Sequence, residues 1–316
     1  MAEIAPVRSR SFERGRALCA DLSRERAEPL EATASRVDHW VLVEYRHLWG
    51  RDPVAGSGLP DEVKRHLREQ VRALPSSRLL FVRRPDRRDV PAFSVFFGRS
   101  TEAERRFFQV EVDSYLELVG LDLAAALGGG DPVGAPLEHP LLVVCTHGKR
   151  DRCCAKYGRP LYDELVAEAD PEWVWQSTHV GGDRFAGNLV CLPEGLFFGR
   201  VGRPDVWGLL DEYLAGRIEL EHYRGRSCYG FAVQAAERRV REVAGLTGID
   251  DLGLEAFERT GEGAWTIRFR VPSLGALYEL DVLREPAEDA VYLTCSAPAP
   301  ERPQRHRVTD HRVLSR

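Results

Sequence analysis

The sequence lacks several features that would each define a class of protein. It has no apolar run of about eighteen residues, and residues 1–16 contain no apolar core of a secretion signal. We therefore expect neither a membrane span nor a signal peptide. Lysine is nearly absent, since only Lys64, Lys149 and Lys156 occur and arginine supplies the remaining positive charge. The formal net charge is -5, with both signs interspersed, so no basic face predicts nucleic-acid binding.

The cysteines follow no disulfide framework. There are seven, an odd number, and no C-x-x-C motif that would indicate a thiol–disulfide enzyme; the adjacent Cys153 and Cys154 are a poor substitute. A phosphatase loop would need an arginine six residues after Cys145, where Asp151 stands instead. We expect reduced thiols in a cytoplasmic protein, a few of them used as ligands.

The length and composition fit a globular protein of more than one domain. The chain has 316 residues, of which 43% are hydrophobic and 29% charged. Two tandem β-α-β-β-β-α units are predicted, offset by about one hundred residues, the size of a small domain. The predicted parts are a first unit without ligands, a second unit that carries the site, a small α+β extension and a disordered tail, over residues 15–128, 135–216, 217–296 and 297–316.

The units are predicted from alternation, from helical periodicity and from turn residues. In the first unit, strands are expected at 40–45, 78–82, 92–97 and 107–112, and helices from 60 to 74 and at 115–127. In the second unit, strands are expected at 141–144, 172–176, 189–192 and 196–201, and helices at 159–169 and 204–215. In the extension, a helix is expected at 233–243 and strands at 265–271, 278–283 and 290–295.

Ligand-type side chains follow two of these strands. Cys145 directly follows one apolar run, with Cys154 nine residues later, and His179 follows the next run just before two glycines. Adjacent strands of one sheet would bring both loops to the same edge. Thiolate and imidazole bind Zn²⁺ and the irons of iron–sulfur clusters. Asp183, four residues after His179, stands where a fourth ligand is expected.

Other cysteines and histidines favour ordinary structural roles. A lone cysteine beside apolar residues is most often a small buried side chain, and we interpret Cys19, Cys191, Cys228 and Cys295 in this way. Cys145 and Cys154 differ because glycine and arginine surround them, and nearby cations favour the thiolate. His147 is interpreted as a turn residue.

The two loops together resemble a known family. The stretch C-T-H-G-K-R-D, with a second cysteine nine residues after the first, and the stretch H-V-G-G-D-R-F-A-G-N resemble the sucrase/ferredoxin-like family of thioredoxin-like [2Fe–2S] ferredoxins. The resemblance is strong over residues 141–202. It extends more weakly to residues 29–34, 40–50, 224–227 and 233–237.

This resemblance implies a thioredoxin-like fold and a [2Fe–2S] cluster held by two cysteines and two histidines. Carried over by position, the ligands are Cys145, Cys154 and His179, and the second histidine falls at Asp183. A Cys/Cys/His/Asp site is therefore our first choice, with Cys153 as the substitute for the fourth ligand.

The implied function is one-electron transfer rather than catalysis, with a flavin-dependent or other reductase as the partner and neither nucleic acid nor membrane. A structural Zn²⁺ site of the same residues is the first rival. Sucrose hydrolysis, which the family name also suggests, has little support because it needs two positioned carboxylates and no stretch presents such a pair.

Overall fold

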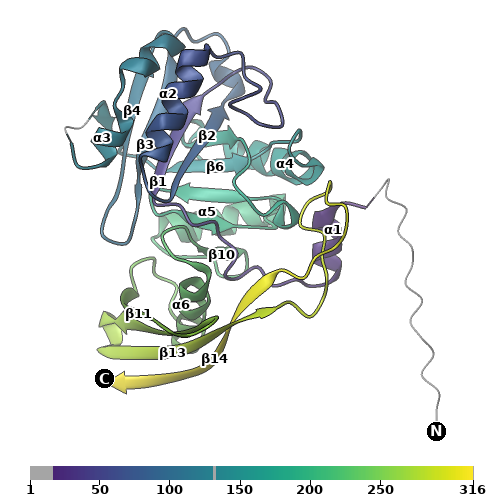
Figure 1. Cartoon of the computed structure of the whole chain (residues 1–316), viewed down its shortest axis with the longest axis vertical. Coiled ribbons are helices and arrows are strands. Elements are labelled where there is room, and N and C mark those ends of the chain that lie inside the picture. The colour runs from purple at the N-terminus through teal and green to yellow at the C-terminus, as the bar shows by residue number, and fades with distance from the viewer. Residues whose placement is uncertain (1–16, 131–132, 316) are drawn as a thin grey trace.

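The computed structural model describes residues 17–130 and 133–315. It is a mixed α/β protein in which a large curled sheet carries helices and a smaller sheet lies below it, as Figure 1 shows. The large sheet has ten strands in the order β10-β9-β8-β6-β7-β2-β1-β3-β4-β5, and the small one has four in the order β11-β12-β13-β14. The α/β class predicted from the sequence is confirmed.

The first half of the large sheet contains the predicted strands within a few residues. Its strands are β1 (His39–Glu44), β2 (Ser77–Arg83), β3 (Phe93–Ser100), β4 (Arg105–Val112) and the short β5 (Ala135–Pro136). Its helices are α2 (Asp61–Arg72) and α3 (Leu123–Leu127). Helix α1 (Cys19–Glu25) precedes them in the chain and contacts Asp183–Phe185 of the second half. The single helix predicted at 115–127 is instead a 3-10 turn over Tyr115–Gly120 followed by α3, because Asp122 caps a new helix by accepting a hydrogen bond from the Ala125 amide.

The second half has the same kinds of element. Its strands are β6 (Leu141–Cys145), β7 (Val174–Ser177), β8 (Leu189–Leu192), β9 (Leu196–Phe198) and β10 (Tyr223–Arg226), and its helices are α4 (Arg152–Glu168) and α5 (Val206–Leu214). Every residue of β6 is buried, as expected for a strand covered on both faces.

The two halves of the large sheet have the same pattern of strand pairing. In each half the first two strands are parallel (β1 with β2, β6 with β7), and the third is antiparallel to the first (β3 with β1, β8 with β6). The fourth strand is antiparallel to the third. The halves join through antiparallel β2 and β7, where Val82 pairs with Ser177.

Helix α4 begins earlier than the sequence predicts. Pro160 suggested a helix that opens near 159, yet α4 starts at Arg152 and holds Pro160 in its interior. The reason is the cap: the Asp151 side chain accepts a 2.9 Å hydrogen bond from the Cys153 amide. This places both Cys153 and Cys154 in the first turn of the helix.

The C-terminal part is more ordered than predicted. Its elements are α6 (Phe231–Ala244), β11 (Gly253–Gly261), β12 (Ala264–Val271), β13 (Ala276–Pro286) and β14 (Gln304–Ser315). The prediction of a disordered tail at 297–316 is wrong for β14, because its backbone pairs with β13 from Gln304 to Ser315 and Val308 packs against the core of the small sheet. The strand predicted at 290–295 is a loop, with one isolated bridge between Val291 and Glu301.

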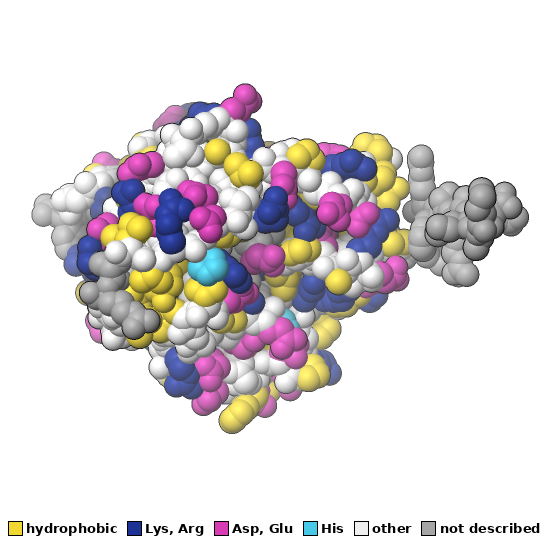
Figure 2. Space-filling view, turned by 90° about the horizontal axis from the view of Figure 1, so that it is seen from below, with side chains coloured by type: hydrophobic (Ala, Val, Ile, Leu, Met, Phe, Trp, Pro, Cys, Tyr) yellow, Lys and Arg dark blue, Asp and Glu magenta, His cyan; other side chains and the backbone are white. Residues whose placement is uncertain are grey.

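Alternate residues of the central strands enter different cores. Leu142 and Val144 pack with α4 and α5, whereas Val143 and Cys145 pack on the other face with Trp40 and Trp175. On the face seen in Figure 2, basic and acidic side chains are interspersed. Among the described residues, no helix has the length and apolar character needed to cross a membrane.

Candidate metal centre

Three of the predicted ligands converge at one edge of the large sheet. Cys145 is the last residue of β6 and pairs in parallel register with Ser177, the last residue of β7. His179 follows Ser177 by two residues, so it lies at the same edge of the sheet as Cys145. Cys154 approaches from the first turn of α4. The two sulfurs and a ring nitrogen of His179 all lie within 4.8 Å of one another. The expectation that neighbouring strands bring both loops together agrees with this register.

Asp183 contacts two of these three residues, His179 and Cys154. Its Oδ1 is 2.9 Å from His179 Nδ1 and accepts a 3.3 Å hydrogen bond from Cys154 Sγ. The geometry toward His179 is not that of a hydrogen bond, so Nδ1 is a buried nitrogen without a hydrogen-bond partner among the described residues. A metal or cluster iron would give both side chains a partner, and the donor set of two thiols, an imidazole and a carboxylate fits such a group.

Cys153, the alternative fourth ligand, lies elsewhere. Its sulfur is close to the sulfurs of Cys19 and Cys295, in a group that does not include Cys145. Consecutive residues of an α-helix point about 100° apart, so Cys153 and Cys154 face different neighbours. Cys19 and Cys295 were interpreted as lone buried cysteines, and their sequence positions gave no signal of this second group.

The protonation states of the first group are strongly coupled. The Cys145 thiolate accepts a hydrogen bond from Cys154 and is further stabilised by His179. Together these contacts hold the pKa of Cys145 well below its usual value. The same contact with Cys145 raises the pKa of Cys154 well above its usual value. Burial opposes a charged His179, but Asp183 and Cys145 together raise its pKa to about 9. Without a metal, one thiolate therefore has an imidazolium beside it.

The loop that carries His179 has a backbone that glycine favours. Gly181 and Gly182 have φ of 102° and 80°, and a Cβ at Gly182 would lie 2.4 Å from Arg224 Nη2. Arg224, which is fully buried, donates to the Gly181 carbonyl at 3.0 Å and to Asn188 Oδ1 at 2.8 Å. Asn188 in turn donates to the Gly182 carbonyl at 2.9 Å. Together they fix the loop.

Two arginines supply positive charge behind the site, the buried Arg224 and the partly buried Arg78. Arg78 donates from Nη1 to the Val180 carbonyl, and both Arg78 and Arg224 interact electrostatically with Cys145. Burial lowers the pKa of Arg224 to about 9. Sequence reasoning gave neither residue a role, although Arg224 lies in one of the weaker stretches of family resemblance.

His147 contacts a loop of the first half. Its Nε2 lies 2.8 Å from the Gly50 carbonyl, and its ring meets Trp49 edge-on at 5.8 Å between centroids. The interpretation as a turn residue agrees with these contacts, which connect the Cys145 loop to the loop after β1.

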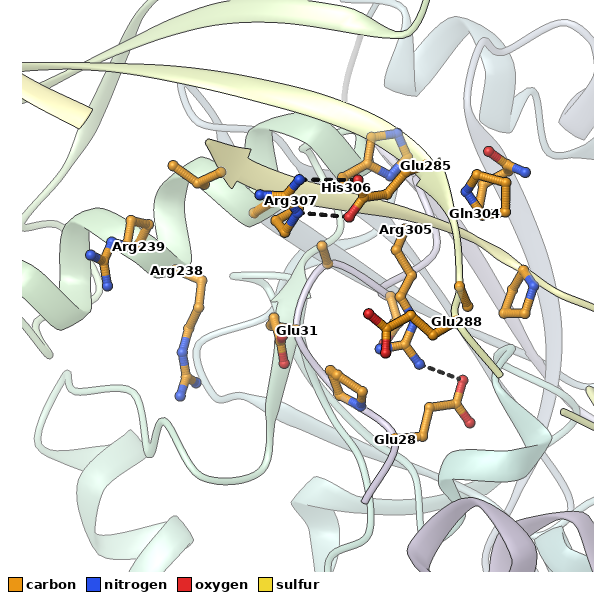
Figure 3. Close-up of a pocket in the computed structure, with 18 of the residues that line it drawn as sticks. Glu28, Glu31, Arg238, Arg239, Glu285, Glu288, Gln304, Arg305, His306 and Arg307 are labelled. Atoms are coloured by element: carbon orange, nitrogen blue, oxygen red, sulfur yellow. Dashed lines mark hydrogen bonds and ion pairs between the residues drawn. The ribbon is translucent and has the colours of Figure 1, made fainter. Parts of the chain in front are cut away.

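A recess of about 570 Å³ lies away from both cysteine groups. Figure 3 shows charged side chains of both signs around it, from the segment before β1, from α6 and from β14. Several of them pair with one another: Arg305 lies 3.6 Å from Glu28, and Arg307 lies 2.7 Å from Glu285. No cysteine lines it, so the convergent cysteines remain the candidate centre.

The fold and this centre define an α/β protein with a Cys/Cys/His/Asp group at the ends of two parallel strands. The Sucrase/ferredoxin-like family matches residues 30–225, more than half of the sequence, and the chain belongs to this family.

Several curated relatives match a shorter stretch, and each is called altered inheritance of mitochondria protein 32. The protein from Meyerozyma guilliermondii is 36% identical over 95 residues, which is 27% of this chain and 34% of that protein. The protein from Debaryomyces hansenii is 33% identical over 95 residues, 27% of this chain and 35% of its own length. The chain thus matches about a third of the length of these relatives. No solved structure matches.

Proposed function

We propose that the protein is a thioredoxin-like [2Fe–2S] ferredoxin that transfers single electrons. The observation that carries this proposal is the convergence of two thiols, one imidazole and one carboxylate at the ends of two parallel strands. Membership of a ferredoxin-like family supports it. The repeated strand order supports the finer proposal of two tandem thioredoxin-like units, of which the second carries the cluster.

Cys145, Cys154, His179 and Asp183 would hold the cluster, which when bound supplies a one-electron redox couple. Replacing thiolates by neutral imidazole raises the reduction potential of such a centre, because it removes negative charge. The positive charges of the partly buried Arg78 and the buried Arg224, both of which interact with Cys145, act in the same direction. Val180 and Phe185, which are fully buried, keep water away from one side of the site.

His179 offers the route to a partner. Its side chain is 26% exposed, whereas Cys145, Cys154 and Asp183 are at most 2% exposed. We propose that a flavin-dependent or other reductase docks over His179 and that the protein works as a carrier rather than as an enzyme. A cytoplasmic location remains our proposal, and the relatives' name makes mitochondria the alternative to test by fractionation.

A structural Zn²⁺ site is the second candidate, and one observation favours it. Three donor atoms within 4.8 Å of one another also suit a single tetrahedral ion, and a carboxylate is an ordinary fourth ligand for zinc. Such a site would leave the fold unchanged and would carry no electrons.

The visible spectrum of anaerobically purified protein separates the two candidates. We expect charge-transfer bands between about 320 and 600 nm, equal amounts of iron and acid-labile sulfide, and their loss in Cys145→Ser. Cys228→Ala, which changes a buried cysteine outside both groups, should keep them. A colourless protein whose zinc is lost in Cys145→Ser would refute electron transfer.

A further inference from the structure

A second group of ligand-type side chains contains three thiols and includes Cys153, the neighbour of Cys154 in the sequence. The sulfur of Cys153 is 3.5 Å from that of Cys19 and 3.3 Å from that of Cys295, and the Cys19 and Cys295 sulfurs are 3.7 Å apart. Both carboxylate oxygens of Asp151 lie 3.9 Å from Cys19 Sγ. The sulfurs thus form a nearly equilateral triangle beside a carboxylate.

The three sulfurs come from segments far apart in the sequence. Cys19 begins α1, Cys153 lies in the first turn of α4, and Cys295 lies in the loop between β13 and β14. Figure 1 shows this loop beside α1. Cys19, Cys153 and Asp151 are at most 3% exposed, and Cys295 is partly exposed.

The spacing matches thiolates that share one small ion. With zinc–sulfur bonds of about 2.3 Å, the sulfurs of a tetrahedral site lie about 3.8 Å apart. The observed 3.3–3.7 Å are close to this value. A disulfide would need two of these sulfurs to approach to about 2.05 Å and would leave the third without a partner.

Backbone groups are also arranged to stabilise negative sulfur. The Ala20 amide donates to Cys153 Sγ at 3.4 Å, and the Cys19 amide donates to Cys295 Sγ at 3.5 Å. The carboxylate of Asp151 is oriented by the amides of Cys153, at 2.9 Å, and of Cys295, at 2.6 Å. The group also lies at the positive end of the 17-residue α4.

We propose that Cys19, Cys153, Cys295 and Asp151 bind one zinc ion in a closed structural site. Three thiolates and one carboxylate complete a tetrahedral coordination without an open position for chemistry. The ion fastens the β13–β14 loop and α1 to α4. The ion would add to the few backbone hydrogen bonds that the loop makes with itself among the described residues: the bridge between Val291 and Glu301, one bond from the Ala287 amide to the Pro303 carbonyl, and one from the Ala297 amide to the Thr294 carbonyl. The proposal stands whether or not the first centre holds an iron–sulfur cluster.

Metal analysis of the full-length protein and its single variants tests this proposal. We expect about one zinc per chain in the wild type and in Cys145→Ala, which disables only the first centre. Cys295→Ser and Cys19→Ser should each lose the zinc and keep the visible bands of the first centre. Cys228→Ala is the matched control and should keep both metals.

Cys295 lies in a loop, so its variant should fold even if Cys19→Ser does not. As a second measurement, chelation with EDTA should lower the thermal midpoint of Cys145→Ala and leave that of Cys145→Ala/Cys295→Ser unchanged. Zinc that persists in Cys145→Ala/Cys295→Ser, in which the first centre is also disabled, would overturn the proposal. A wild type without zinc would overturn it as well, whether the thiols are free, joined in a disulfide with a mass about 2 Da lower, or bound to copper.

Discussion

At the scale of single residues, Asp183 is the departure from the family pattern with the largest consequence. The resemblance implies histidine there, and the structure places its carboxylate 2.9 Å from His179 and within hydrogen-bonding distance of Cys154. Carboxylate carries a negative charge that neutral imidazole does not. A centre with Asp183 therefore has a lower potential than one with two histidines, other things being equal.

Asp183→His is the variant that isolates this charge. We expect it to retain iron and sulfide and to shift the reduction potential upward, because imidazole replaces a charged ligand. Redox titration of the visible bands measures the shift. Asp183→Ala removes the ligand and should lose most of the iron; full iron content in this variant would show that Asp183 is not a ligand.

At the scale of elements, the junction between the two halves of the sheet includes a hydrogen bond to one side-chain hydroxyl, that of Thr178. At the junction of β2 and β7, the Phe81 amide donates to Thr178 Oγ1 at 3.0 Å, and the Thr178 amide donates to the Phe81 carbonyl at 2.9 Å. Both residues are buried. A side chain therefore completes the backbone ladder where the two halves meet.

Thr178→Val should lower the free energy of unfolding by about 1–3 kcal/mol, because it leaves the buried Phe81 amide without an acceptor. Urea denaturation of metal-free protein measures the loss. Thr178→Ser keeps the hydroxyl and is the matched control, with a smaller effect expected. A loss in Thr178→Val that is no larger than the loss in Thr178→Ser would contradict the role of the hydroxyl.

His222 makes the start of β10 sensitive to pH. Its Nδ1 lies 3.0 Å from Glu219 and its Nε2 lies 3.4 Å from Asp205. Burial opposes the charged ring, but these carboxylates outweigh burial and raise the pKa of His222 above its usual value. Burial likewise opposes the Glu219 carboxylate, and its hydrogen bonds with His222 lower the pKa of Glu219.

The stability that His222 contributes should therefore be present below its unfolded pKa of about 6.5 and be lost as the pH rises through its higher folded value. The contribution of Glu219 is lost as the pH falls below about 4.5. We expect His222→Gln to destabilise most between about pH 5 and 6, by about 1 kcal/mol or less because the pair is partly exposed.

Urea denaturation at pH 5.5 and at pH 8.5 checks this expectation. His66→Gln is the control, since His66 forms no ion pair among the residues that the structure describes. A destabilisation by His222→Gln that is the same at both pH values would contradict it.

The sequence predicted most strands and the approach of Cys145 to His179, because apolar runs bounded by turns are local signals. It did not predict β5, β10 and β11, and the strand expected at 290–295 is a loop. It missed the true start of α4, where the Asp151 cap extends the helix past an interior proline. It also missed β14 and the group around Cys153. Both depend on contacts with residues that are distant in the sequence, Glu279 and Glu285 for β14 and Cys19 for Cys153. No spacing along the sequence reveals these contacts.

At the scale of the whole molecule, the last strand, β14, forms one edge of the small sheet. β14 pairs with β13 along almost its whole length, and Val308 packs against the core formed by α6, β12 and β13. Removing β14 would make β13 an open edge and expose this core.

A chain that ends at Pro303 should unfold at a temperature lower by on the order of 10 °C, because it loses the backbone pairing of β14 with β13 and the packing of Val308, which together cost several kcal/mol. It should also associate through the exposed edge of β13. Differential scanning calorimetry and size-exclusion chromatography measure both effects. Arg312→Ala removes ion pairs of a side chain that is 44% exposed and leaves Glu279 paired with Arg268, so it should leave the midpoint nearly unchanged. A monomeric truncated chain with an unaltered midpoint would contradict the expectation.

The ten-stranded sheet ends in strands that give another molecule little to pair with. On one side, β5 has two residues, and the adjoining β4 carries Arg106 and Glu111. On the other side, the segment that leads into β1 closes β10: the Thr33 amide donates to the Arg224 carbonyl, and the Val37 amide donates to the Ser227 carbonyl. A protein with so wide a sheet can thus reach high concentration in a cell without adding strands from its own copies into fibres.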